Sequence, residues 1–133
     1  MEYLVGIVLA LAVCAFALLV GLDRDRAFYP TVAIVVASYY DLFAVTGGGD
    51  ALRPELLGTA AFVALAALAF RSSLWWAVLA IAGHGIFDGF HATVIADPGV
   101  PAWWPGFCLS FDVVAGLWLA GLILSGRIAA TKR

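Results

Sequence analysis

Residues 3–22 read YLVGIVLALAVCAFALLVGL, a run of twenty residues that carries no charged side chain. An α-helix that crosses the hydrocarbon core of a bilayer needs about 20 predominantly apolar residues, because the helix rises about 1.5 Å per residue. This stretch has both the length and the composition of such a helix. It is therefore the first candidate for a membrane-spanning helix in this chain.

The composition of the whole chain agrees with that class of fold. Of the 133 residues, 65% are hydrophobic and 12% are charged, and the mean hydropathy is +1.05. Soluble domains contain about 45–50% apolar and about 25% charged residues, so a soluble fold would expose far more apolar surface than one small core can bury. A net charge of −2 and two cysteines argue against a nucleic-acid binder and a disulfide scaffold. We expect an integral membrane protein that has the lipid bilayer as its partner and binds no nucleic acid.

Four further segments qualify, or nearly qualify, as membrane-spanning helices. The predicted fold is all-α, a single transmembrane domain over residues 1–133 with five spans, at about 3–22, 27–46, 54–70, 74–96 and 103–125. The connections between the spans are short, which favours an antiparallel bundle of five transmembrane helices in which successive helices are neighbours. A bundle of this size has little room for a pore of its own, so transport would require a homo-oligomer.

Basic residues set the expected orientation, because cytoplasmic loops of membrane proteins carry an excess of lysine and arginine. Arg53 is the one basic residue on one side of the predicted bundle. The six on the other side are Arg24, Arg26, Arg71, Arg127, Lys132 and Arg133. We therefore predict a multi-pass membrane protein with its N-terminus outside the cell and its C-terminus in the cytoplasm.

Ionisable side chains inside the predicted spans stand out, because each costs about 2.5–3.5 kcal/mol at the centre of a membrane helix. The densest group, GHGIFDGFH, lies in the fourth span. At about 100° per residue, His84, Asp88 and His91 share one narrow face of that helix. In the fifth span, Cys108 and Asp112 are four residues apart and also share a face.

The predicted helices place these groups at similar depths. At about 1.5 Å per residue, Asp41 and His91 lie about 7 Å below the outer ends of their helices, and Asp112 lies about 14 Å below. Three helices therefore place polar groups in the outer half of the membrane. The rim above them is predicted to be acidic, because its charged residues are Glu2, Asp50, Glu55 and Asp97 against Arg53. An acidic entrance raises the local concentration of cations.

A group of imidazoles and carboxylates suits a divalent transition metal such as zinc, iron or manganese. The predicted polar or metal site consists of His84, Asp88, His91 and Asp112, with Asp41, Cys108 and Tyr40 as secondary candidates. Two other interpretations stay open. His84 and Asp88, at i and i+4, can simply satisfy each other, or the group can relay protons or monovalent cations. Asp41 and Asp112 can likewise form interhelical hydrogen bonds as protonated carboxyls.

The available residues exclude several membrane cofactors. A retinal Schiff base needs a lysine within the bundle, whereas the one lysine is Lys132 in the tail. A bis-histidine haem needs imidazoles that converge from opposite faces of its ring. Both histidines of this chain lie on one side of one predicted helix, about 10 Å apart. No arrangement typical of a serine or cysteine nucleophile is visible, so the catalytic residues are unknown and an enzymatic function stays open.

The C-terminal part of the chain carries a resemblance to a known family. It reads GHGIFDGFH, then a loop with Asp97-Pro98 and Pro101, then Cys108-x3-Asp112 and Trp118. In this order it resembles an uncharacterised family of small bacterial integral membrane proteins, which is defined as a domain of unknown function. The resemblance implies an intramembrane polar site and a place in the bacterial inner membrane. It implies no activity.

Three functions fit these predictions. The first is a small membrane protein that binds or conducts a cation, either a divalent metal ion or a proton, at a polar site near the outer leaflet. The second is a small metal-dependent enzyme in which the bound metal activates water against a lipid-like substrate. The third is an accessory or structural subunit whose polar residues only fix the packing of the helices.

Overall fold

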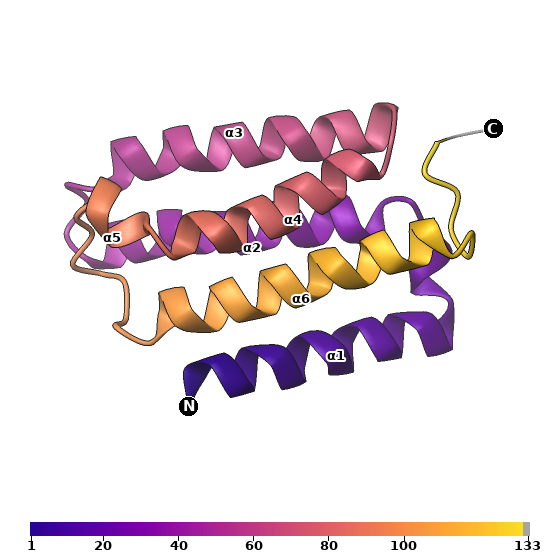
Figure 1. Cartoon of the computed structure of the whole chain (residues 1–133). Helices are drawn as coiled ribbons and strands as arrows, with labels where there is room; N and C mark the ends of the chain where they lie inside the picture. The colour runs from indigo at the N-terminus through magenta and orange to yellow at the C-terminus, as the bar shows by residue number, and fades with distance from the viewer. Residues whose placement is uncertain (132–133) are drawn as a thin grey trace.

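The computed structural model describes residues 1–131, so Lys132 and Arg133 of the basic tail lie outside the described residues. Over residues 1–131 the chain is all-helical, as the sequence predicts. The helices are α1 (Glu2–Val20), α2 (Phe28–Thr46), α3 (Leu52–Arg71), α4 (Trp75–Asp88), α5 (His91–Val94) and α6 (Trp104–Leu124), with a 3₁₀ turn, η1, at Leu22–Arg24. The longer helices lie side by side along one direction, so that the loops gather at the two ends of a bundle (Figure 1).

Four helices in the described part of the chain are long and apolar enough to cross a membrane. They are α1, α2, α3 and α6, which contain 19 to 21 residues each. Their outward faces carry large apolar side chains, such as Leu19 at 85% exposure and Leu57 at 70%. Contiguous apolar surface of this kind is a liability in water and suits contact with lipid. The length, composition and exposed apolar faces of these helices therefore support the prediction of a transmembrane protein.

The fourth predicted span is not one continuous helix. α4 ends at Asp88, and α5 begins at His91 after a turn at Gly89 and Phe90. The prediction of a single helix over 74–96 is therefore wrong. Glycine costs about 0.8–1.0 kcal/mol relative to alanine inside a helix, and a carboxylate such as Asp88 is unfavourable at a helix C-terminus. The 14 residues of α4 make a helix of about 21 Å, shorter than a hydrocarbon core of about 30 Å.

Small residues bring α4 and α6 close together. An added Cβ at Gly85 would lie 2.8 Å from the Cβ of Asp112, and one at Gly116 would lie 2.8 Å from the Cβ of Ala82. Side chains do not approach one another so closely, so the two glycines are what permits the helices to pack at this distance. The antiparallel packing of α4 on α6 sets His84 beside Asp112.

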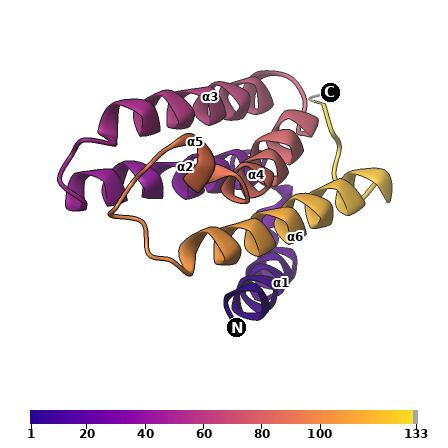
Figure 2. The ribbon, with the colours of Figure 1, turned by 60° about the vertical axis from the view of Figure 1, so that its left-hand side comes forward.

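The first helix does not pack as its short connection to α2 predicts. α1 lies against α6 through a stripe of small buried residues, Gly6, Ala10, Cys14 and Ala17. Both helices begin at the end of the bundle that carries the N-terminus, so they run in the same direction, and Figures 1 and 2 place α1 on the side of α6 away from α3. Because α2 packs on α3 and α4 instead, the expectation that successive helices are antiparallel neighbours fails for α1 and α2.

Most of the basic residues gather at the opposite end of the bundle. Arg26 donates hydrogen bonds to the carbonyl oxygens of Ala129 and Ala130 (3.1 Å each) and of Ser72 (3.2 Å). It thereby joins the first loop, the α3–α4 connection and the C-terminal tail. The described basic residues at this end are Arg24, Arg26, Arg71 and Arg127, whereas Arg53 lies at the other end. Which end faces the cytoplasm stays a prediction.

Candidate functional site

A histidine and two aspartates meet in the interior between α4 and α6. Nδ1 of His84 lies 2.8 Å from Oδ2 of Asp112, as a hydrogen bond between the two helices, and 3.4 Å from Oδ2 of Asp88, one turn along α4. All three residues are at most 2% exposed. We call His84, Asp88 and Asp112 the triad. Each offers one metal-ligand atom, and these atoms lie within 4.8 Å of one another.

The carboxylates of the triad are only partly satisfied by the protein around them. Among residues 1–131, neither oxygen of Asp88 has a hydrogen-bonding partner, and the same is true of Oδ1 of Asp112 and the hydroxyl of Tyr40. A buried charge without a partner is strongly unfavourable, so buried carboxylates are protonated, paired or bound to a metal. One imidazole between two carboxylates leaves negative charge that a further cation, a proton or a metal ion, would neutralise.

One distance within the triad is close to that of a small divalent metal site, and the three ligand atoms all lie within 4.8 Å of one another. Two ligand atoms bound tetrahedrally to zinc at about 2.0–2.1 Å lie about 3.3 Å apart. The 3.4 Å between His84 and Asp88 matches this value, whereas the 2.8 Å between His84 and Asp112 is the length of a hydrogen bond. An ion that replaced the shared proton would require the shorter distance to widen by about 0.5 Å. The nitrogen and oxygen donors suit zinc, iron or manganese.

His91 does not join the triad. Because the chain turns after Asp88, Nε2 of His91 instead lies 2.7 Å from Oε1 of Glu55 on α3, and these two side chains are 2% and 3% exposed. The predicted site of four residues is therefore divided between two places. The prediction that Glu55 belongs to an exposed outer rim is wrong, because the residue is buried and its carboxyl group is hydrogen-bonded to His91.

The sequence of α3 contains a pattern that places Glu55 on the face of the helix turned toward the bundle interior. Glu55, Thr59 and Phe62 recur at i, i+4 and i+7, which is the spacing of one helix face. Thr59 donates a hydrogen bond of 3.2 Å to the carbonyl oxygen of Ala37 on α2, and the ring of Phe62 lies 4.8 Å from that of His84. This face of α3 is therefore turned toward α2 and α4, and it carries Glu55 with it.

Tyr40 of α2 lies between the triad and the His91–Glu55 pair. Its ring centroid is 4.1 Å from that of His91 and 5.8 Å from that of His84. Its hydroxyl faces Asp88, and the residue is only 2% exposed. Tyr40, a secondary candidate from the sequence, thus connects the two imidazole–carboxylate groups.

The other secondary candidates lie beside the triad. Cys108 is one turn from Asp112 on α6, is 2% exposed and carries a free thiol. Asp41 is half-buried, and it is close enough to Glu55 for the two charges to interact. Neither residue belongs to the group of metal-ligand atoms found within residues 1–131.

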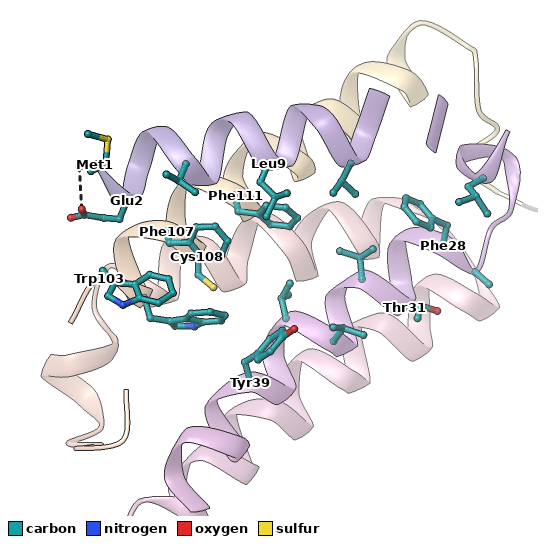
Figure 3. Close-up of a pocket in the computed structure, with 18 of the residues that line it drawn as sticks. Met1, Glu2, Leu9, Phe28, Thr31, Tyr39, Trp103, Phe107, Cys108 and Phe111 are labelled. Carbon is teal, nitrogen blue, oxygen red and sulfur yellow. Dashed lines mark hydrogen bonds and ion pairs between the residues drawn. The ribbon is translucent and has the colours of Figure 1, made fainter. Parts of the chain in front are cut away.

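A long apolar groove runs between α1 and α2 and has α6 as its floor (Figure 3). Its volume is about 1020 Å³, and its lining extends from Met1 and Trp103 at one end to Phe28 at the other. The groove exists because α1 packs on α6 and leaves α2 uncovered. Cys108 lies in its wall, one turn from Asp112, so the groove passes close to the triad.

No protein-family model, no curated protein and no solved structure matches this chain. The resemblance to small bacterial membrane proteins therefore stays a prediction. The fold and the site define the class: a helical protein with transmembrane segments and a buried group of one histidine and two aspartates in the half of the bundle nearer the N-terminus.

Proposed function

We propose that this chain is a multi-pass protein of the bacterial inner membrane that binds a divalent cation in the triad. The proposal counts five crossings, with α4 and α5 together forming the fourth, over residues 75–94. Support comes from the path of α4, which connects the two ends of the bundle (Figure 1). With the arginine-rich end in the cytoplasm, the N-terminus is outside and the triad lies in the outer half of the membrane.

One observation carries the proposal of a cation site. Two buried carboxylates share one imidazole, and three of their four oxygens have no hydrogen-bonding partner among residues 1–131. In a low-dielectric interior such a group requires a compensating positive charge. A divalent ion fits it better than a single proton, because an ion placed between His84, Asp88 and Asp112 contacts all three donors, whereas a proton occupies one hydrogen bond. The hydroxyl of Tyr40, which faces Asp88, is a further oxygen donor beside the ion.

Calorimetric titration of the detergent-solubilised protein with Zn²⁺ tests the proposal. We expect one strong site per chain that is lost in Asp88→Asn and in Asp112→Asn, since both changes keep the size of the side chain and remove its charge. Asp50→Asn is the matched control, because Asp50 is an exposed aspartate at the same end of the bundle. Equal binding by the unmodified protein and both triad variants would contradict the proposal.

The groove favours a second candidate function, a metal-dependent enzyme that acts on a lipid-like substrate. Its apolar walls can take an acyl chain from the bilayer, and Cys108 places part of the wall one turn from Asp112. A metal ion in the triad would supply an activated water there. Zn²⁺-loaded protein incubated with phospholipid vesicles should then release products that mass spectrometry detects and that Asp112→Asn abolishes. Zn²⁺ binding without lipid turnover would contradict the enzyme and leave cation binding as the supported function.

Two other functions predict different results in these assays. A proton relay predicts no strong Zn²⁺ site, together with a proton flux in proteoliposomes that His84→Ala abolishes. Because the bundle is small, such conduction would require a homo-oligomer. An accessory subunit predicts neither metal binding nor flux, and co-purification with a larger membrane complex.

A further inference from the structure

His91 and Glu55 form a second buried group, which the triad does not use. We infer that this pair is an entry site, at which a divalent cation binds on its way from the outer end of the bundle to the triad. The inference rests on the proposed function, since it assumes that the triad holds the cation. It adds a route into the site and a second set of ligands.

A surface pocket leads to the pair from the outer end. Its volume is about 430 Å³, it is lined by α5, the loop that follows and Pro105 at the start of α6, and His91 lies in its wall. Asp97 lines the same pocket, and its Oδ2 has no hydrogen-bonding partner in the described part of the chain. Asp97 is also close enough to Glu55 for the two charges to interact. A cation that enters this pocket therefore meets the carboxylate of Asp97 and the imidazole of His91 in its wall.

The pair offers the donors that a divalent cation needs. Nε2 of His91 and Oε1 of Glu55 are 2.7 Å apart, so one nitrogen and one carboxylate oxygen share a hydrogen bond. A divalent ion can bind to both atoms by displacing the shared proton, which passes to water in the pocket. The hydrogen bond forms again when the ion moves inward. The pair thus binds the ion transiently, whereas the triad, with its unpartnered carboxylate oxygens, retains it.

Tyr40 continues the route from the pair to the triad. Its ring lies against that of His91, with 4.1 Å between the centroids, and its hydroxyl faces Asp88. The neighbouring rings of Phe62 and Phe87 lie 4.8 Å from the triad histidine and 5.7 Å from His91, respectively. An ion is costly in such apolar surroundings. The Tyr40 hydroxyl supplies an oxygen between Glu55–His91 and Asp88, and so lowers that cost.

The rate at which Co²⁺ loads into the protein tests the entry site separately from the triad. In a stopped-flow experiment on the solubilised full chain, the visible absorbance of protein-bound Co²⁺ reports occupation of the triad. The double variant Glu55→Gln/His91→Gln removes both ligands and keeps two side chains that can bond to each other. We expect it to load about tenfold or more slowly, with an unchanged final amount of bound Co²⁺.

A second variant tests the pocket without altering the pair. Val100 lines the pocket, so Val100→Trp should fill part of it and also slow the loading of Co²⁺. Val94→Trp is the matched control, because it introduces the same change at a residue of α5 that is 67% exposed and does not line the pocket. This control should load at the rate of the unmodified protein.

The outcomes distinguish the entry site from the cation site itself. Loading at the unmodified rate by either the double variant or Val100→Trp would overturn the entry site and leave the triad as the binding site. Slow loading by Val94→Trp would also overturn it, because any disturbance of this end would then have the same effect. If the unmodified protein binds no Co²⁺, the proposed function itself fails.

Discussion

Gly85 lies in the contact between α4 and α6, next to His84, and its replacement by alanine tests how the triad is held together. The added Cβ would lie 2.8 Å from the Cβ of Asp112 and 3.0 Å from the carbonyl oxygen of Leu109. Carbon atoms rest about 3.5–4.0 Å apart, so α6 must move away by about 0.7–1.2 Å. The hydrogen bond of 2.8 Å between His84 and Asp112 would then open to about 3.5 Å or more, outside the hydrogen-bonding range.

Gly85→Ala should therefore lose both stability and metal affinity. Overpacking of this kind costs about 1–3 kcal/mol. The added Cβ would also hold the His84 and Asp112 ligand atoms about 3.5–4.0 Å apart, beyond the about 3.3 Å that a bound zinc ion requires, and such a displaced ligand geometry should weaken Zn²⁺ binding by about 10- to 100-fold. Gly83→Ala is the matched control, because an added Cβ at that position of the same helix meets its first neighbour at 3.9 Å. Zn²⁺ titration and thermal unfolding in one detergent compare the two variants. Equally tight Zn²⁺ binding by both would show that the close packing of α4 on α6 does not hold the ligands.

Other parts of the molecule allow similar tests. Glu55→Ala leaves His91 buried without its partner, so the free energy of unfolding should fall by about 1–3 kcal/mol, whereas Asp50→Ala at the exposed end should change it little. If chemical denaturation showed equal losses of unfolding free energy in Glu55→Ala and Asp50→Ala, the buried pair of Glu55 and His91 would not stabilise the fold. Zn²⁺ affinity should fall as the pH is lowered below neutral, since histidine and aspartate must release their protons to bind a metal; calorimetry that finds no dependence on pH would exclude this ligand set. A reporter that is active only in the cytoplasm should be active at the C-terminus, and activity only of a periplasmic reporter would reverse the proposed orientation.

Much of the fold could be predicted because a bilayer restricts sequence so strongly. Apolar stretches of about 20 residues are required to cross it, and the span predicted at 27–46 corresponds to α2 (Phe28–Thr46). Helical spacing also placed His84 and Asp88 on one face of their helix. The depth of Asp112 on a neighbouring helix predicts that it belongs to the same site, and the structure brings these three residues together.

The remaining features depend on contacts between distant segments. A local pattern does not show whether a glycine is tolerated inside a helix or ends it. At Gly89 the helix ends, and the turn lets His91 reach Glu55 on another helix. The position of Glu55 near the outer end of the third predicted span predicts a place on the rim, although its helix face points inward. The neighbour of α1 was also mispredicted, because helices in lipid associate through small residues, and the stripe that contains Gly6 fits α6.

The metal content of the protein as purified tests the central claim, a divalent cation bound by the triad, most directly. The protein should be extracted from membranes without chelators and analysed by inductively coupled plasma mass spectrometry. We predict close to one equivalent of zinc, iron or manganese per chain in the unmodified protein and in Asp50→Asn, and loss of that metal in His84→Ala and Asp88→Ala. Metal-free protein whose thermal unfolding is unchanged in both triad variants would contradict the claim.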